Sequence, residues 1–144
     1  MTITGTTRVF YCIADPVDQV RAPEVFNAVF ARHDIDAVMV PLRVSPAHLD
    51  ATLRVLFESP SVGGVSLSIP HKAAAVASVD RCSPAAAAAN AINAVRRNAA
   101  GELEGDLFDG IGFTRLLGRA GIAFAGRRVL MIGAGGAASA VSTA

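Results

Sequence analysis

The stretch VGGVSLSIPHKAAAVASV, residues 62–79, contains an apolar strand pattern, a proline and a helical pattern, in that order. The apolar and β-branched residues of 62–69 are typical of a buried strand. Pro70 favours the first position of a helix over 70–79, because its missing N–H and fixed φ cost nothing there. This stretch therefore predicts a strand followed directly by a helix, with Lys72 in the first turn of that helix.

The same strand–helix unit occurs twice before this stretch. A strand is predicted over 7–14 and a helix over 22–33; a second strand is predicted over 36–42 and a helix over 45–59. Ser45 can serve as the N-cap of that last helix, with Pro46 at its first position. Repeated alternation of this kind predicts the fold class, an α/β domain with a mostly parallel sheet and helices on both faces.

The second half of the chain changes pattern. After an Ala-rich segment at 83–91, strands are expected over 92–97 and 103–108, joined by a turn, and an amphipathic helix over 109–121. Residues 126–144 then read as a new strand, a glycine turn and a helix. We therefore expect a first domain over 1–109, a connecting helix and linker over 110–125, and the incomplete start of a nucleotide-binding domain over 126–144.

Composition and charge exclude several protein classes. Hydrophobic residues make up 52% of the 144 residues, which indicates a well-buried core. No apolar run reaches the roughly 20 residues of a membrane helix, and no signal peptide is evident, so a cytoplasmic location is expected. Cys12, in an expected strand, and Cys82, in an expected loop, indicate neither a disulfide framework nor a metal site. The formal net charge of +1 and the scattered arginines argue against a nucleic-acid partner.

A glycine-rich turn follows the apolar run at 128–132. Gly133, Gly135 and Ala138 have the G-x-G-x-x-G/A spacing, which permits a tight turn, close approach of backbone to a pyrophosphate, and close helix packing. The alternative is a tight strand–helix turn without a ligand. The residues predicted to bind a dinucleotide are Gly133, Ala134, Gly135, Gly136, Ala137 and Ala138.

Lys72 is the only lysine, whereas the chain has twelve arginines. A first-turn position is unfavourable for a cation, because the helix dipole has its positive end there. Lysine can exchange a proton during a reaction and arginine cannot, which favours a role in proton transfer. The alternative is an exposed lysine that covers the Ala-rich surface of its helix.

Two further polar residues lie in positions that suit a site. Asp109, in LFDGIGF, comes just before a predicted helix, so it is either an N-cap or a functional carboxylate. Asn93, in NAINAV, is a polar residue in an otherwise apolar strand. It either satisfies buried backbone groups or faces a ligand.

Together these segments resemble the shikimate dehydrogenase family along essentially the whole chain. SLSIPHK is similar to the family pattern N-V-T-x-P-x-K, NAINAV to G-A-V-N-T, GDLFDGIGF to G-x-N-T-D-G-x-G-F, and GAGGAAS to the family's cofactor loop. The resemblance implies that Lys72 and Asp109 are the catalytic residues. It also implies that Asn93, Ser68 and Ser66 contact the substrate.

The same resemblance implies an activity. The family transfers a hydride between NADP, or NAD, and a small hydroxy acid such as shikimate, 3-dehydroshikimate or quinate, in aromatic amino-acid biosynthesis. A related polyol is a further candidate, and the protein is expected to be a monomer or a homodimer. Because most of a nucleotide domain is missing from 126–144, the chain alone is expected to be inactive.

The sequence departs from the family pattern in the loop before the first helix. The family carries S-x-S-P there, whereas Val20 and Ala22 occupy the two serine positions. Arg21 lies between them and is a candidate to bind a carboxylate through its guanidinium group. The alternative is that Arg21 is an ordinary surface residue. Leu107 and Phe108 stand where the family has Asn-Thr. Two alternatives therefore remain: a ligand-binding or regulatory relative, and a two-domain dehydrogenase of the methylenetetrahydrofolate type.

Overall fold

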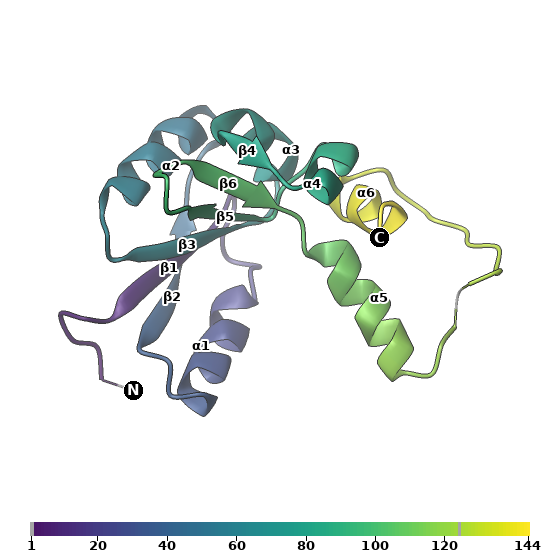
Figure 1. Ribbon diagram of the computed structural model, residues 1–144, viewed down its shortest axis with the longest axis horizontal. Helices are drawn as coiled ribbons and strands as arrows, with labels where there is room; N and C mark the ends of the chain where they lie inside the picture. Colours follow the sequence, from purple (N-terminus) through teal and green to yellow (C-terminus); the bar gives the residue numbers. More distant parts are fainter. Residues whose placement is uncertain (1, 124) are drawn as a thin grey trace.

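The protein forms one six-stranded sheet with helices on both faces (Figure 1). The computed structural model describes residues 2–123 and 125–144; Met1, in the predicted first domain, and Phe124, in the predicted linker, lie outside the described residues. The sheet order is β2-β1-β3-β5-β6-β4. The strands are β1 (Arg8–Ala14), β2 (Ala37–Arg43), β3 (Val62–Leu67), β4 (Arg81–Cys82), β5 (Ala94–Arg97) and β6 (Leu103–Asp106).

The helices lie in two layers. In Figure 1, α1 covers one face of the sheet and α2, α3 and α4 lie on the other, while α5 and α6 extend beyond the sheet. Their bounds are α1 (Ala22–Arg32), α2 (Leu49–Glu58), α3 (His71–Ala74), α4 (Pro84–Ala89), α5 (Asp109–Arg119) and α6 (Gly136–Ser142). Two 3₁₀ turns, η1 (Pro46–His48) and η2 (Ala75–Ser78), adjoin α2 and α3.

The core is divided by the central strand β1. Successive side chains of a strand point to opposite faces, so Cys12 joins one apolar cluster and Ile13 the other. The Cys12 cluster includes Phe30 of α1 together with Ala37 and Met39 of β2. The Ile13 cluster is larger and contains Leu53 and Phe57 of α2 and Leu67 of β3. Burial of β1 on both faces explains its nearly continuous apolar sequence.

One antiparallel strand determines which chain segments meet at the edge of the sheet. β1 pairs in parallel with β2 and β3, and β4 with β6, whereas β5 is antiparallel to both β3 and β6. The start of β5 consequently lies beside the carboxyl ends of β3 and β6. The backbone of Asn93, which directly precedes β5, accepts from Leu67 N at 2.8 Å and donates to Asp106 O at 2.8 Å.

Several predicted elements differ in detail. The helix expected over 70–79 is shorter, because α3 ends at Ala74 and continues as the 3₁₀ turn η2. Ser45 precedes η1 without capping it through its side chain; its Oγ instead lies 3.0 Å from His48 Nδ1. Cys82 belongs to the two-residue strand β4 rather than to a loop.

The strand predicted in 126–132 is wrong: these residues form no strand in the described structure. Leu130 and Ile132 are 87% and 91% exposed. A strand needs a neighbour to satisfy its backbone groups, and no described strand runs beside this segment. The predicted helix after the glycine turn is present as α6.

α6 nevertheless has a definite position, because it packs against α4 and α5. Its Ala140 is buried and lies against Gly110 in the first turn of α5. A Cβ at Gly110 would lie 2.0 Å from the carbonyl oxygen of Ala140. The contact therefore depends on the absence of a side chain at position 110.

Gly110→Ala should destabilise the protein by about 1–3 kcal/mol, because the added methyl group overpacks the α5–α6 contact. Gly112→Ala is the matched control in the same helix, since nothing lies within 4 Å of a Cβ there. The control should stabilise by about 0.5–1 kcal/mol through helix propensity. Urea denaturation measures both, and equal effects of the two substitutions would contradict the packing described here.

Candidate active site

Three polar side chains that are far apart in the sequence meet at the carboxyl edge of the sheet. Lys72 lies in α3, just after β3; Asp109 is the first residue of α5, just after β6; and Asn93 directly precedes β5. The first turn of a helix is confirmed as the place of Lys72. Asp109 is not an N-cap, since Phe108 holds that position, and Asn93 lies outside the strand in which it was predicted.

Asp109 is bonded through both of its carboxylate oxygens. Its Oδ2 accepts a short hydrogen bond from Lys72 Nζ in an ion pair, and its Oδ1 accepts from Asn93 Nδ2 at 2.7 Å. Asn93 Oδ1 accepts in turn from the backbone N–H of Phe108 at 2.9 Å. Asn93 thus satisfies a backbone N–H group, as one of its predicted alternatives describes, and it also bonds Asp109; that it faces a ligand stays a prediction.

The position of Lys72 is restrained by backbone contacts as well. Its carbonyl oxygen accepts from Ile92 N at 2.8 Å, which ties α3 to the segment before β5. The side chains of Lys72 and Asp109 are 20% and 30% exposed, so the pair is shielded on most sides and still open to a small molecule. A lysine held by a carboxylate in this way can donate or accept a proton at an adjacent oxygen atom.

The remaining predicted contact residues have no hydrogen bond or ion pair to Lys72 or Asp109 in the described structure. Ser68 is partly buried just before α3, and its carbonyl oxygen accepts from His71 N at 2.9 Å. Ser66 lines a cavity of about 680 Å³ that Phe108 also lines. Arg21 directly precedes α1, its side chain is 78% exposed, and it forms an ion pair with Glu24 at 2.6 Å. The structure therefore groups Lys72, Asn93 and Asp109 by direct contact, whereas Arg21 has a partner elsewhere.

Sequence reasoning missed His71, which precedes Lys72. Its side chain is fully buried, and neither ring nitrogen has a hydrogen-bond partner among the described residues. Burial lowers the pKa of His71 from its ordinary value of 6.5; the nearby Val44 carbonyl and the charge of Asp15 oppose this shift without reversing it. Only its place beside Lys72 could have drawn attention to this histidine.

The glycine turn before α6 has an uncovered backbone. Gly133 has a φ of +111°, which a side chain would strain, and a Cβ at Gly133 or Gly135 would meet nothing within 4 Å. This open backbone directly precedes the first turn of α6. On the other side, a Cβ at Gly136 would lie 3.3 Å from Lys72 Cβ. The residues present therefore fit a phosphate-containing cofactor beside Lys72.

A cavity of about 820 Å³ lies elsewhere, between α5, α6 and residues 121–123 and 127–131, and its lining does not include Lys72, Asn93 or Asp109. Among residues 2–123 and 125–144, no three or more His, Cys, Asp or Glu side chains are grouped so that they could hold a metal ion. None of the described helices is both long and apolar enough to cross a membrane.

The fold and the site define a class, an α/β domain with a paired lysine and aspartate at the carboxyl edge of its sheet and a glycine turn against the lysine. Residues 12–95 match the family model of the shikimate dehydrogenase substrate binding domain. The chain is 39% identical over 142 residues to a shikimate dehydrogenase (NADP(+)) of Anaeromyxobacter sp. (strain K), covering 99% of this chain and 50% of that protein. The chain belongs to the shikimate dehydrogenase family.

Solved structures give the same result for the fold. A shikimate 5-dehydrogenase of Listeria monocytogenes, in complex with shikimate and NAD, matches with a TM-score of 0.90 and 32% identity, over 98% of this chain and 48% of that one. A 5-ketofructose reductase of Gluconobacter sp. strain CHM43 matches with a TM-score of 0.86 and 26% identity, over 97% and 50%. The chain therefore spans about half the length of the relatives it matches.

His71 should make the stability of the protein depend on pH. Because its pKa is lower in the folded protein than in the unfolded chain, its contribution is fully present above 6.5 and is lost as the pH falls through the folded value. His71→Gln removes this titration. Urea denaturation between pH 7 and pH 5 should show a smaller loss of unfolding free energy for the variant than for the wild type. Equal losses in both proteins would contradict the burial of a neutral imidazole.

Proposed function

We propose that this chain supplies the substrate site, and the beginning of the cofactor site, of an NADP-dependent oxidoreductase that interconverts an alcohol and a ketone. The observation that carries the proposal is the Lys72–Asp109–Asn93 group, against which the glycine turn is packed. The relatives named above support the reaction, since one is a shikimate dehydrogenase (NADP(+)) and another binds shikimate and NAD. Shikimate and 3-dehydroshikimate are accordingly the first substrates to test, followed by quinate and polyols.

In this proposal Lys72 handles the proton at the reacting oxygen. In the reductive direction Lys72 Nζ donates a proton to the carbonyl oxygen, and in the oxidative direction it accepts the proton of the hydroxyl group. Asp109 keeps the ammonium group in position and offsets its charge, and Asn93 keeps the carboxylate of Asp109 in position. The hydroxyl groups of Ser66 and Ser68 hydrogen-bond to the substrate's own hydroxyl groups.

The cofactor is held by residues 133–138 in this proposal. Backbone N–H groups at the start of α6 would bind its pyrophosphate, and Gly133 and Gly135 would leave room for it. When bound, the nicotinamide supplies or takes up the hydride. The contact of Gly136 with Lys72 keeps the cofactor loop beside the proton donor. The proposed division is a substrate domain over 1–109, a connection over 110–125 and the start of a nucleotide domain over 126–144.

The cellular role follows from the family. We place the enzyme in the cytoplasm, in aromatic amino-acid biosynthesis, as a monomer or a homodimer. NADP is the cofactor that we expect, because the Anaeromyxobacter relative is a shikimate dehydrogenase (NADP(+)), although the Listeria structure contains NAD.

Lys72→Ala should lower kcat by roughly 10²- to 10⁴-fold, which is the usual contribution of a positioned acid or base. The assay follows NADPH formation with shikimate, quinate and polyols, using the whole polypeptide that contains this sequence. Lys72→Arg keeps the positive charge but cannot release a proton, so it should be nearly as impaired as Lys72→Ala.

Two comparisons make this experiment decisive. Arg119→Ala, an exposed position in the last turn of α5, controls for general effects of substitution and should keep the wild-type kcat. Wild-type turnover in Lys72→Ala would disprove the proton-transfer role. If Lys72→Arg is highly active and Lys72→Ala is not, the residue provides charge without transferring a proton.

A further inference from the structure

Of the four described residues of α3, the helix that carries Lys72, only His71 has a buried side chain. Lys72 is partly buried, and Ala73 and Ala74 are exposed. No side chain caps the start of this helix. A helix of one turn has little stability of its own, so contacts with the rest of the protein determine its position. The packing of α3 therefore depends mainly on the imidazole ring of His71.

The buried face of α3 continues into η2. Its members are His71, Ala75 and Ser78, which are three to four residues apart and so share one side of the helical segment. Ala75 and Ser78 have small side chains, whereas His71 is among the largest fully buried side chains of the described chain. Because its ring has no exposed surface, this packing does not depend on chain segments outside the described residues.

α3 is held on two sides. On one side, Lys72 is bonded to Asp109 through its ammonium group. On the other side, the ring of His71 lies near the carbonyl group of Val44 and the charge of Asp15, which directly follow β2 and β1. Loss of the ring would remove the larger contact on this second side. The position of the lysine would then be much less restrained.

Histidine is an unfavourable choice if packing is its only role. Neither ring nitrogen of His71 has a hydrogen-bond partner among the described residues, and burial of unsatisfied polar groups is costly. A leucine would fill a similar space without that cost. A costly group directly beside the residue proposed to transfer a proton indicates that the group contributes to the same function.

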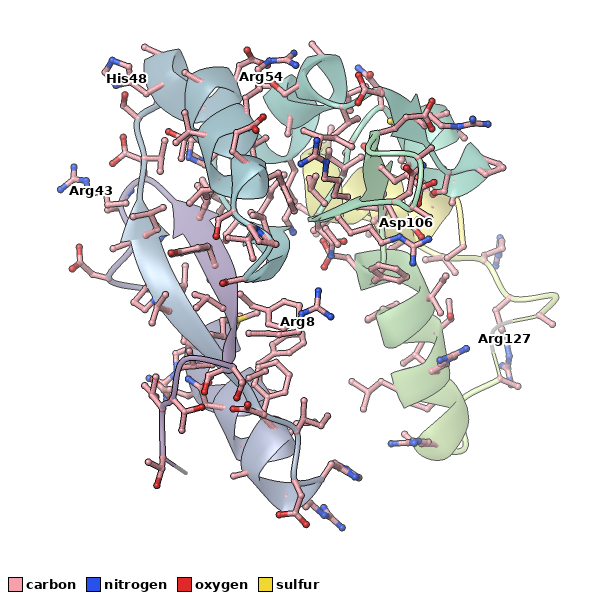
Figure 2. The ribbon with its side chains drawn as sticks, turned by 60° about the vertical axis from the view of Figure 1, so that its left-hand side comes forward. Arg8, Arg43, His48, Arg54, Asp106 and Arg127 are labelled. Atoms are coloured by element: carbon pink, nitrogen blue, oxygen red, sulfur yellow. The ribbon has the colours of Figure 1, made fainter. Side chains whose placement is uncertain are left out.

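Asp15 is the charged group that acts on the ring, and it also pairs with Arg43 at 2.7 Å. Charged and titratable side chains of the adjoining β2, η1 and α2 are paired or point outward in Figure 2: Arg43, His48, Asp50 and Arg54. Lys72, on α3 itself, has its own carboxylate partner. The charge of Asp15 is thus shared, and burial keeps the pKa of His71 below its ordinary value.

We infer that His71 is a positioning residue for Lys72: its buried ring anchors α3 and so holds the lysine beside Asp109. This inference rests on the proposed function, in which Lys72 transfers the proton. A protonated ring is too costly to keep enclosed, so acidification releases α3 and the lysine with it. His71 thereby makes the activity sensitive to acid, although its ring is enclosed and contacts no substrate.

Two substitutions in the whole polypeptide separate the size of the ring from its charge. His71→Ala removes the anchor and should lower kcat by roughly 10- to 10²-fold, with a much smaller change in KM, because a displacement of about 1 Å suffices for such a loss. His71→Leu refills the space and should restore kcat at neutral pH. Between about pH 7 and pH 5, kcat should fall more steeply for the wild type than for His71→Leu, which has no titrating ring.

A double-mutant cycle shows whether His71 acts through the lysine. In a Lys72→Ala background, His71→Ala should cause no further loss of kcat, because coupled positions are not additive. Phe57→Leu is the matched control for a loosened core and should keep the wild-type kcat. Phe57 is buried in the last turn of α2, five residues before β3, so it lies at the opposite end of β3 from α3.

A second readout does not require turnover. Acetic anhydride acylates free lysine amines, and peptide mass spectrometry measures the rate of this reaction at Lys72 alone. In His71→Ala the rate should rise about fivefold or more, because the lysine is released locally. In His71→Leu the rate should stay at the wild-type level.

The outcomes separate the two proposals. The anchor is overturned by wild-type kcat and acylation in His71→Ala, by equal losses in His71→Ala and His71→Leu, or by additive losses in the double variant. If His71→Ala does not fold, the wild type and His71→Leu decide by themselves, since equal pH dependence of kcat overturns the inference. The expected acylation rates without turnover of any substrate support the anchor and overturn the proposed function.

Discussion

The backbone of Asn93 is the constraint on which the site depends. Its N–H and C=O bridge the ends of β6 and β3, because β5 runs against both strands. The two strand ends are thereby held at a fixed separation. Lys72 follows one of them within five residues and Asp109 follows the other within three, so the distance between these side chains is set by sheet hydrogen bonds. The side chain of Asn93 then adds a direct bond to Asp109.

The direction of one strand, β5, therefore determines which side chains reach the site. In a fully parallel sheet, the residue before a strand would lie at the amino edge, far from the ligand-binding crevice. Reversal of β5 places Asn93 at the carboxyl edge instead. The site combines two residues that follow strands with one that precedes a strand, and Asn93 lies 21 residues after Lys72 and 16 residues before Asp109.

Much of the fold was predictable because local patterns and tertiary packing agree. β1 is nearly continuously apolar, α1 has apolar residues at helical spacing, and the hairpin of β5 and β6 follows from its turn residues. The segment 126–132 shows the limit of this reasoning. Its apolar residues predict a strand, but a strand forms only beside another strand, and sequence periodicity does not report whether one is available. The change from α-helix to 3₁₀ turn between α3 and η2 could not be predicted from the sequence either, because alanine suits both helix types.

Some features of the candidate site could likewise be predicted from the sequence, and others could not. Lys72 stands out as the only lysine, but the catalytic roles of Lys72 and Asp109 were implied by the family resemblance, since the residues alone left other interpretations open. Their direct contact could not be predicted without the direction of β5. The burial of His71 was invisible for a different reason: a histidine in a helix's first turn is usually solvated, and only the packing beneath α3 shows that this one is enclosed.

Asp109 and Gly110 are adjacent in the sequence, and each meets a different requirement of the structure. Asp109 bonds Lys72 and Asn93, while Gly110 lets the backbone of α6 approach α5. A single dipeptide thus serves both the polar site and the docking of the helix that follows the glycine turn. An insertion or a deletion at this point would displace the carboxylate of the polar site and the contact between α5 and α6 together.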